Sequence, residues 1–396
     1  MQSFVPSMDQ QDLSQLILQN NERYHTHFSH QTKTKRASSL STQAKSNTLK
    51  KNYDSKGASS IRIPSHNKKH HLKQVLHKDL QNIISISHQN NTYITEIRED
   101  ISSYLSFAII GMSKTGTTSL LRTLANSTNI IPKERCDLVN DDIPLLLNAL
   151  YNLKQSSSNP NLPYGIKCPQ DVSAPKSINN YKKHFYKTKL IIGLRHPVLW
   201  FESLYNFNVR NMNKMIHTDK LERCVRGSHG ICAWRANIAD FLAALNKTPL
   251  NKEEMQYMAL PETRQKKDGN VGPVFLYEIS QLNEDTDGVS FELRKDLAEF
   301  LGIKESISEI PHVSTAGVLD WIDGVKDFTK DYMIDICDEE HAFIRSVLMT
   351  KAKNASEWIL KYFLQSADVH VSSRDYFVKQ IKGWSQDPCI YRAKTK

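Results

Sequence analysis

The chain has 396 residues, of which 39% are hydrophobic, and it carries a formal net charge of +10 with a pI of about 9.1. This length supplies material for a buried core in one large domain or two smaller ones. The positive charge favours anionic partners, and nucleic acid, an acidic polysaccharide and a polyanionic cofactor all fit it. No run of about 18 or more apolar residues occurs, so the sequence pattern excludes a transmembrane helix.

The N-terminal segment MQSFVPSMDQQDLSQLILQN has neither the basic region nor the continuous apolar region of a signal peptide. As it reads, the sequence therefore predicts a cytoplasmic protein. Two features point instead to a secretory lumen. Cys224 and Cys232 bracket a turn-rich stretch and could close a small disulfide loop. Glycosylation sequons are present at Asn90, Asn126, Asn246 and Asn354.

Residues 1–94 are rich in Ser, Gln, Asn, His and Lys and contain few large apolar side chains. Short apolar runs such as LQNIISI cannot bury enough surface to order this whole segment, so we predict a disordered, basic N-terminal arm. Its paired lysines and histidines could contact an anionic surface, although such runs are more often a solvated tail. The folded domain is expected to span residues 95–396.

From Tyr93 onward, short β-branched runs alternate with helical patterns. The predicted strands are continuous apolar runs, which suit a sheet covered on both faces; they span 107–112, 164–168, 189–194 and 274–279. Helical patterns occupy 117–125, 198–207, 291–301, 342–351 and 355–364. This repetition predicts an α/β fold, a single P-loop-like domain with a central parallel sheet flanked by helices.

The segment FAIIGMSKTGTTSLLRTL runs from a buried strand through a glycine-containing loop into a helix that opens at Thr117. A helix N-terminus presents free N–H groups and a positive dipole end, so this geometry receives phosphate. The spacing of Gly111 and Gly116 matches a Walker A loop, but the lysine that should follow the second glycine is absent. A lysine stands inside the loop instead, at position 114.

In that position Lys114 could reach the bridging oxygen of a phosphosulfate and stabilise the charge that develops on the leaving phosphate. A Walker lysine with magnesium serves the β- and γ-phosphates of a triphosphate, which is a different task. A strand-to-helix turn without any ligand is the alternative. The clustering of lysine and hydroxyl groups favours a phosphate site, whose predicted members are Ser113, Lys114, Thr115, Gly116, Thr117 and Thr118.

A second phosphate-binding segment follows the third predicted strand, which ends at Arg195. Open α/β sheets bind ligands at this end of their strands. Ser203 follows two helical turns later, and a guanidinium and a hydroxyl can together bind one phosphate. The alternative is an arginine bonded to a carboxylate, with the serine merely exposed.

These segments resemble motifs of the sulfotransferases that use 3′-phosphoadenosine-5′-phosphosulfate (PAPS). Residues 113–118 resemble the 5′-phosphosulfate loop P-K-[ST]-G-T-[TS], with serine in place of proline, and residues 195–203 resemble the 3′-phosphate motif, with histidine in place of Asp or Asn. Residues 165–169 are similar to the lysine-bearing strand end of heparan-type members. Residues 277–278 resemble the Y-E strand of carbohydrate sulfotransferases, and residues 382–383 resemble their basic glycine loop.

The resemblance implies transfer of a sulfuryl group from PAPS to a hydroxyl or amine, with a carbohydrate acceptor, no required metal and no specific nucleic-acid partner. It also implies residence in the Golgi lumen. Lys114 would stabilise the leaving group and Lys167 would assist near the acceptor. Glu134 would take the acceptor proton, because heparan-type members place a glutamate about twenty residues after the phosphate loop.

Several alternatives stay open from the sequence. Glu134 could be a surface carboxylate paired with Lys133 or Arg135, and His196, His217 or His229 could be the base instead. A P-loop nucleoside-phosphate kinase or NTPase would need a lysine at position 117 and a magnesium-binding aspartate at a strand end, and neither is evident. A non-catalytic anion-binding module would have no need of Lys114 together with Arg195.

Overall fold

The computed structural model describes residues 80–89, 92–212, 236–245, 247, 270–283, 288–309 and 333–392. The chain divides into two units, residues 1–62 and 63–396, and all described residues belong to the second. Most of the predicted arm lies outside the described residues. So do Cys224 and Cys232, His217 and His229, and the sequons at Asn90 and Asn246.

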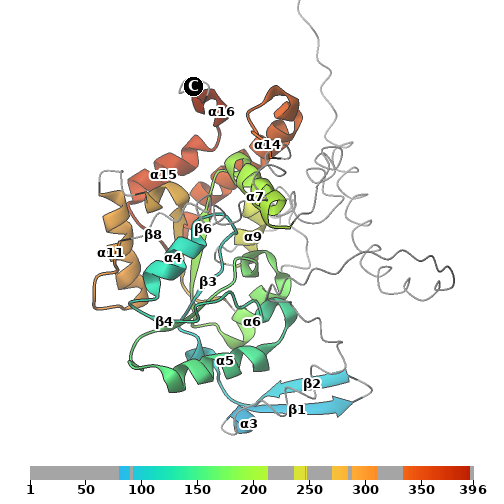
Figure 1. The fold of residues 1–396 in the computed structure, drawn as a ribbon, viewed down its shortest axis with the longest axis vertical. Coiled ribbons are helices and arrows are strands. Elements are labelled where there is room, and N and C mark those ends of the chain that lie inside the picture. The colour runs from blue at the N-terminus through green and yellow to red at the C-terminus, as the bar shows by residue number, and fades with distance from the viewer. Residues whose placement is uncertain are drawn as a thin grey trace, which may run out of the picture. The chain divides into compact units, whose positions relative to one another are not determined.

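A six-stranded parallel sheet forms the centre of the described part, in the order β4-β5-β3-β6-β7-β8 (Figure 1). Its strands are β3 (Phe107–Ile109), β4 (Asn129–Ile130), β5 (Tyr164–Lys167), β6 (Lys189–Leu194), β7 (Val274–Glu278) and β8 (Val369–Val371). The four predicted strands and the predicted α/β fold are thus confirmed. The sequence missed β4 and β8, which at two and three residues are too short to produce a periodic pattern.

Side chains of these strands alternate between two apolar layers, because successive residues of a strand point to opposite faces. Phe107, Ile109 and Ile191 belong to the core beneath α4 (Thr117–Leu124) and α11 (Val289–Leu301). Ala108 and Ile192 belong to the larger core on the other face. Both faces are therefore covered, which explains why the strands read as continuous apolar runs.

The larger core is covered by helices on the other face of the sheet (Figure 1). These helices are α5 (Ile143–Ser156), α6 (Pro175–His184), α7 (Pro197–Met212), α9 (Ile238–Ala244), α14 (Ala342–Lys361) and α15 (Arg374–Gly383). A short α16 (Cys389–Arg392) follows, and 3-10 turns occur at Ser102–Tyr104 (η1), Leu138–Asn140 (η2), Asp171–Ser173 (η3), Ile279–Leu282 (η6), Glu339–His341 (η7) and Phe363–Gln365 (η8). The two helices expected at 342–351 and 355–364 form the single helix α14, because no Gly or Pro separates them. None of the described helices combines the length and the apolarity needed to cross a bilayer.

An antiparallel hairpin precedes the sheet. It consists of a short α3 (Leu80–Ile83), β1 (Ile84–Gln89) and β2 (Thr92–Ile97), so the expected domain boundary at 94/95 falls inside β2. Leu80, Ile83 and Ile84 are buried in the larger core. The run LQNIISI is too small to form a core of its own, but it gains burial by packing on the apolar residues of the domain.

Two glycines bring β3 and β6 into close approach near their carboxyl ends. A Cβ added to Gly111 would overlap the backbone nitrogen of Gly193, and a Cβ added to Gly193 would lie 2.5 Å from both the Thr115 Oγ1 and the Tyr277 hydroxyl. Only a residue without a side chain fits at either position. The glycines therefore determine how closely the loop after β3 approaches β6.

We predict that Gly111→Ala lowers the free energy of unfolding by about 1–3 kcal/mol, because the backbone of β6 must shift to admit the methyl group. Urea denaturation measures this change. Gly383→Ala is the matched control, since its Cβ would meet no atom within 4 Å and alanine is favoured over glycine in a helix. Equal stability of the two variants would contradict the assigned close approach.

Candidate functional site

The candidate site lies at the carboxyl ends of the adjacent strands β3 and β6, which are followed by connections that run to opposite sides of the sheet. The chain leaves β3 through α4 toward β4 on one side of the sheet, and it leaves β6 through α7 toward β7 on the other. Ligands of open α/β sheets bind at such a switch point, outside the carboxyl ends of the strands. The loop after β3 and Arg195 after β6 are both at this point.

The loop after β3 has a specific backbone conformation. Lys114 and Gly116 have φ angles of 69° and 80°, in the left-handed region that non-glycine residues seldom adopt. The Thr115 hydroxyl donates a hydrogen bond of 2.6 Å to the Met112 carbonyl inside the turn. Helix α4 begins directly after Gly116, and no side chain caps its first N–H groups. These N–H groups are therefore available to an anion.

Three donors from other strands and helices bind the loop carbonyls. The Trp200 indole N–H donates to the Ser113 carbonyl at 2.8 Å, and the Tyr277 hydroxyl donates to the Thr115 carbonyl at 2.9 Å. Arg195 Nη1 donates to the Lys114 carbonyl at 3.4 Å. The loop carbonyls are thus turned toward the protein. Tyr277 belongs to the Y-E strand that the sequence singled out, although its contact with the loop was not predicted. Trp200 was missed, and its only signal in the sequence is membership in the helix that follows Arg195.

The side chain of Lys114 extends toward α7. Its Nζ lies 4.3 Å from the centre of the Phe207 ring, which is 37% exposed. A cation over an aromatic face is attracted by the ring quadrupole, so this contact orients Lys114. The lysine head group therefore lies beside an exposed aromatic surface at the edge of the site.

Lys167, at the end of β5, contacts two other residues that the sequence predicted as site residues. Its Nζ donates to the Thr118 Oγ1 at 2.9 Å and to the Glu134 Oε1 at 2.7 Å. The lysine side chain is 3% exposed and the glutamate side chain is 54% exposed. The buried charge of Lys167 is therefore compensated by a carboxylate that still faces solvent. Glu134 does not pair with Arg135, which forms its ion pair with Asp137 at 2.8 Å.

The backbones that carry Lys167 and Glu134 are joined directly. The Arg135 N–H donates to the Lys167 carbonyl at 2.9 Å. Cys136 and Cys168 form a disulfide with a Cα–Cα separation of 5.1 Å. From the sequence, a disulfide was predicted only for the neighbouring pair Cys224 and Cys232. The link between Cys136 and Cys168 was missed because these cysteines are 32 residues apart and no local pattern connects them.

A cleft of about 950 Å³ extends from Arg195 along the carboxyl edge of the sheet to α15. Its basic side chains are Arg195, Lys379 and Lys382, and Gly383 and Trp384 also contribute to its wall. Lys382 and Gly383, which resemble the basic glycine loop, therefore lie in the same cleft as Arg195. Within the described ranges, no three His, Cys, Asp or Glu side chains gather in a way that could hold a metal ion.

Burial shifts the pKa values of three residues that line this cleft. It lowers the pKa of Arg195 and raises the pKa of Glu278, although the arginine charge opposes the shift of the glutamate. Glu278 accepts hydrogen bonds from the backbone N–H and the hydroxyl of Ser280. Burial also lowers the pKa of His196 to about 4. His196 is therefore neutral near pH 7, and its Nδ1 accepts the Val198 N–H at 3.2 Å, at the start of α7.

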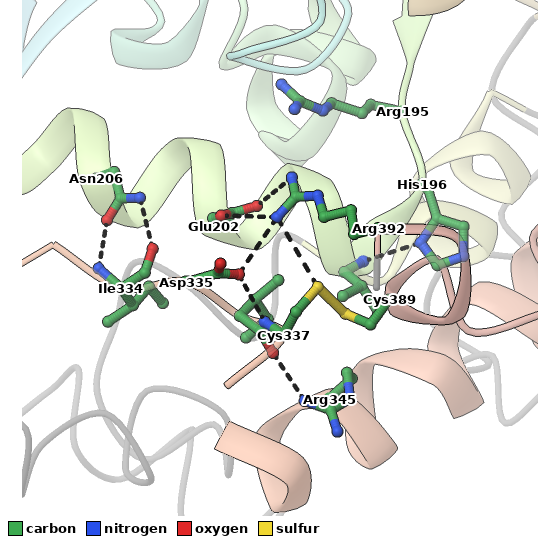
Figure 2. Close-up of polar contacts among 12 residues, drawn as sticks. Arg195, His196, Glu202, Asn206, Ile334, Asp335, Cys337, Arg345, Cys389 and Arg392 are labelled. Atoms are coloured by element: carbon green, nitrogen blue, oxygen red, sulfur yellow. Dashed lines mark hydrogen bonds and ion pairs between the residues drawn. A yellow bond between two sulfur atoms is a disulfide. The ribbon is translucent and has the colours of Figure 1, made fainter. Parts of the chain in front are cut away.

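The C-terminal segment joins α7 through a second polar network (Figure 2). Arg392 donates to both oxygens of Glu202 at 3.1 and 2.9 Å and lies 3.4 Å from Asp335. The disulfide between Cys337 and Cys389, with Cα atoms 5.3 Å apart, lies beside this network. The Glu202 charge favours the charged form of Arg195 and so raises its pKa, and the Arg392 charge opposes this effect.

The remaining predicted phosphate ligand is Ser203, which is half-buried on α7 next to Glu202. Among the described contacts, no hydrogen bond joins it to Arg195. The structure therefore brings the loop residues and Arg195 together, and it brings Lys167 together with Glu134 and Thr118. It leaves the pairing of Ser203 with Arg195 as a prediction.

Comparisons with known proteins add little to this geometry. No family model and no curated protein matches the chain. Among solved structures, the chain is similar to a sulfotransferase from Alicyclobacillus acidocaldarius, with 16% identity and a TM-score of 0.37. The match covers 64% of this chain and 95% of that one. A similarity of this size carries no functional argument, so the function must be argued from the site residues.

A buried carboxyl group lies behind the site. Asp171, in the turn η3 that follows Lys167, is fully buried and accepts hydrogen bonds of 2.8 Å from both the Ser177 and the Tyr181 hydroxyls. Burial raises the pKa of Asp171 to about 7, although both hydrogen bonds favour its charged form. Unfolding returns the group to its ordinary value of 3.8.

We predict that wild-type stability falls between about pH 4 and pH 7 relative to an Asp171→Asn variant. In this range the folded state retains a proton that the unfolded state releases, so a rising pH favours unfolding. The measurement is urea denaturation of both proteins at about pH 5 and about pH 8. Relative to wild type, the free energy of unfolding of the variant should be larger at the higher pH than at the lower pH. An identical pH dependence of the two proteins would refute the raised pKa of Asp171.

Proposed function

We propose that this chain is a sulfotransferase that moves a sulfuryl group from PAPS to a hydroxyl or amine of an acceptor. One observation carries the proposal. Two phosphate-binding segments 81 residues apart meet at the carboxyl ends of adjacent strands, where Arg195 donates to the Lys114 carbonyl. The cleft with its basic lining opens from the same arginine.

The residues suit a nucleotide that is anionic at two separate places. Loop 113–118 offers N–H groups at the start of α4 together with Lys114, which fits a 5′-phosphosulfate. Arg195 lies across the switch point, with Ser203 as its proposed partner for a 3′-phosphate. The cleft volume of about 950 Å³ is in the range that small-molecule sites occupy.

The proposed chemistry is a displacement at sulfur. The acceptor oxygen or nitrogen forms a bond to sulfur while the bond between sulfur and the bridging oxygen breaks, and the phosphate of the departing nucleotide keeps the electron pair. Lys114 stabilises that developing charge. Glu134 accepts the acceptor proton, and its partial exposure leaves one carboxylate oxygen accessible while Lys167 binds the other.

A nucleotide kinase or NTPase is the main competing function, and the position of Lys167 opposes it. Thr118 matches in spacing the hydroxyl residue of a Walker A loop, which binds magnesium. Here the ammonium group of Lys167 lies 2.9 Å from that hydroxyl. A fixed cation in this place repels a second cation, so the site favours chemistry in which lysine supplies the positive charge.

The acceptor and the compartment complete the proposal. We propose a carbohydrate acceptor, which rests on the resemblance at Lys167 and at residues 277–278. Two disulfides in one domain suit an oxidising compartment such as the Golgi lumen. The asparagines of two sequons, Asn126 and Asn354, are exposed, whereas the hydroxyl residues Thr128 and Ser356 are buried.

We predict that 3′-phosphoadenosine 5′-phosphate (PAP) raises the melting temperature more than ATP or AMP does, without added magnesium. Two separate phosphate sites bind PAP, whereas AMP can occupy only one of them. A thermal-shift titration in the presence of a chelator tests this directly. Equal shifts with ATP, or a strict requirement for magnesium, would favour the kinase alternative.

We further predict that Lys114→Ala and Arg195→Ala have different kinetic effects. Lys114 meets a charge that is largest in the transition state, so its loss should lower kcat by about 10²–10³-fold. Arg195 is proposed to bind the remote 3′-phosphate, so its loss should mainly weaken PAP binding. Steady-state kinetics and PAP titrations distinguish the two, and the exposed Lys133→Ala serves as the control that retains turnover. Near-normal turnover of Lys114→Ala would contradict the proposed mechanism.

A further inference from the structure

The disulfide between Cys136 and Cys168 lies directly beside the pair formed by Lys167 and Glu134. Cys168 follows Lys167 in the chain, and Cys136 follows Glu134 by two residues. We infer that Cys136 and Cys168 are positioning residues, whose disulfide keeps the Glu134 carboxylate against the Lys167 ammonium. The positioning of the pair is independent of the proposed function, and only the role of the pair in catalysis rests on that function.

The two members of the pair differ in how firmly their backbones are fixed. Lys167 ends β5, which pairs with β3 on one side and β4 on the other, and its side chain is 3% exposed. Glu134 lies outside any helix or strand, after the two-residue β4, and its side chain is 54% exposed. The lysine is therefore fixed by the sheet, whereas the glutamate needs a further constraint.

Among the described residues, two backbone hydrogen bonds besides the disulfide attach the segment after β4 to β5, and the first joins the Ile131 N–H to the Gly165 carbonyl at 3.0 Å. The Arg135 N–H bonds the Lys167 carbonyl at 2.9 Å. The Arg135 side chain turns away from β5 and binds Asp137 and, at 3.4 Å, the Leu145 carbonyl. The covalent link from Cys136 is therefore the strongest constraint on the distance between the two backbones.

Loss of this constraint has two local consequences. The exposed carboxylate gains freedom to leave the lysine for water, because a partly exposed ion pair contributes little by itself. Among the partners that the described residues offer, Lys167 then keeps Thr118 alone, which favours entry of water and exposure of its ammonium group. The reactivity of the Lys167 amine therefore reports on whether the disulfide positions the pair.

The second disulfide provides a matched control. Cys337 and Cys389 are 52 residues apart, Cys136 and Cys168 are 32 residues apart, and the chain entropy that a disulfide removes from the unfolded state changes slowly with loop length. Removal of either link should therefore affect global stability to a similar degree. Only removal of the first should change the surroundings of Lys167.

The first experiment uses the full chain and needs no activity. Cys136→Ala/Cys168→Ala and Cys337→Ala/Cys389→Ala are compared with wild type by hydrogen exchange of the Arg135 amide and by the rate of reductive methylation of Lys167. We expect both rates to rise at least about tenfold in the first variant and to stay within about twofold of wild type in the second, as for a local opening. If Lys167 methylation stays at the wild-type rate in the first variant, or rises equally in both, the inference is overturned.

Should the first variant fail to fold, the same labelling is carried out on wild type and on Cys337→Ala/Cys389→Ala after mild reduction and again after reoxidation. In the second protein, the link between Cys136 and Cys168 is the only disulfide of the described residues that can respond, and adding Cys224→Ala/Cys232→Ala removes the remaining two cysteines of the chain. Reversible exposure of Lys167 in both supports the inference. Unchanged protection after complete reduction of that link overturns it.

A kinetic cycle then tests whether the reaction uses this positioning. Removal of Cys136 and Cys168 should lower kcat by roughly 10–100-fold in the wild-type background with PAP affinity unchanged, since small misplacements of a reacting group are costly. In a Glu134→Gln background the same removal should change kcat less than about twofold, because the group being positioned is already lost. An equal loss in both backgrounds would indicate a structural role and overturn the inference. Failure of wild type to bind PAP contradicts the proposed function alone, whereas unchanged Lys167 labelling contradicts the positioning role alone.

Discussion

A buried ammonium group, that of Lys167, imposes the main constraint on this site. A cation with 3% of its side chain exposed needs oxygen partners, and it has Thr118 from the start of α4 and Glu134 from the segment after β4. Thr118 precedes β4 in the chain, and Glu134 follows it. The two contacts of the Lys167 ammonium group therefore join the start of α4 and the segment after β4 to the end of β5.

The loop after β3 is held in one conformation by side chains from other parts of the sheet edge. Its carbonyls accept hydrogen bonds from Trp200, Tyr277 and Arg195. Such preorganisation reduces the cost of ordering the loop when a ligand binds. The left-handed conformation of Lys114 belongs to this arrangement, because a residue with positive φ is maintained only where its neighbours require it.

The two disulfides have different places in this design. The link between Cys136 and Cys168 joins the backbones beside Lys167 and Glu134. The link between Cys337 and Cys389 lies beside the contacts in which Arg392 binds Glu202. The first disulfide therefore constrains the candidate site directly, whereas the second constrains the C-terminal segment.

The sequence by itself determined the four main strands, the loop and helix that follow β3, and the position of Arg195 after β6, because apolar runs and glycine spacing are local signals. Only the tertiary structure decided that Lys167 meets Glu134, that Cys136 pairs with Cys168, and that Trp200 and Tyr277 support the loop. It also decided that Leu80, Ile83 and Ile84 are buried and that β4 and β8 join the sheet. These features depend on the order of strands in space, and no local pattern encodes that order because the contacting residues lie tens of residues apart.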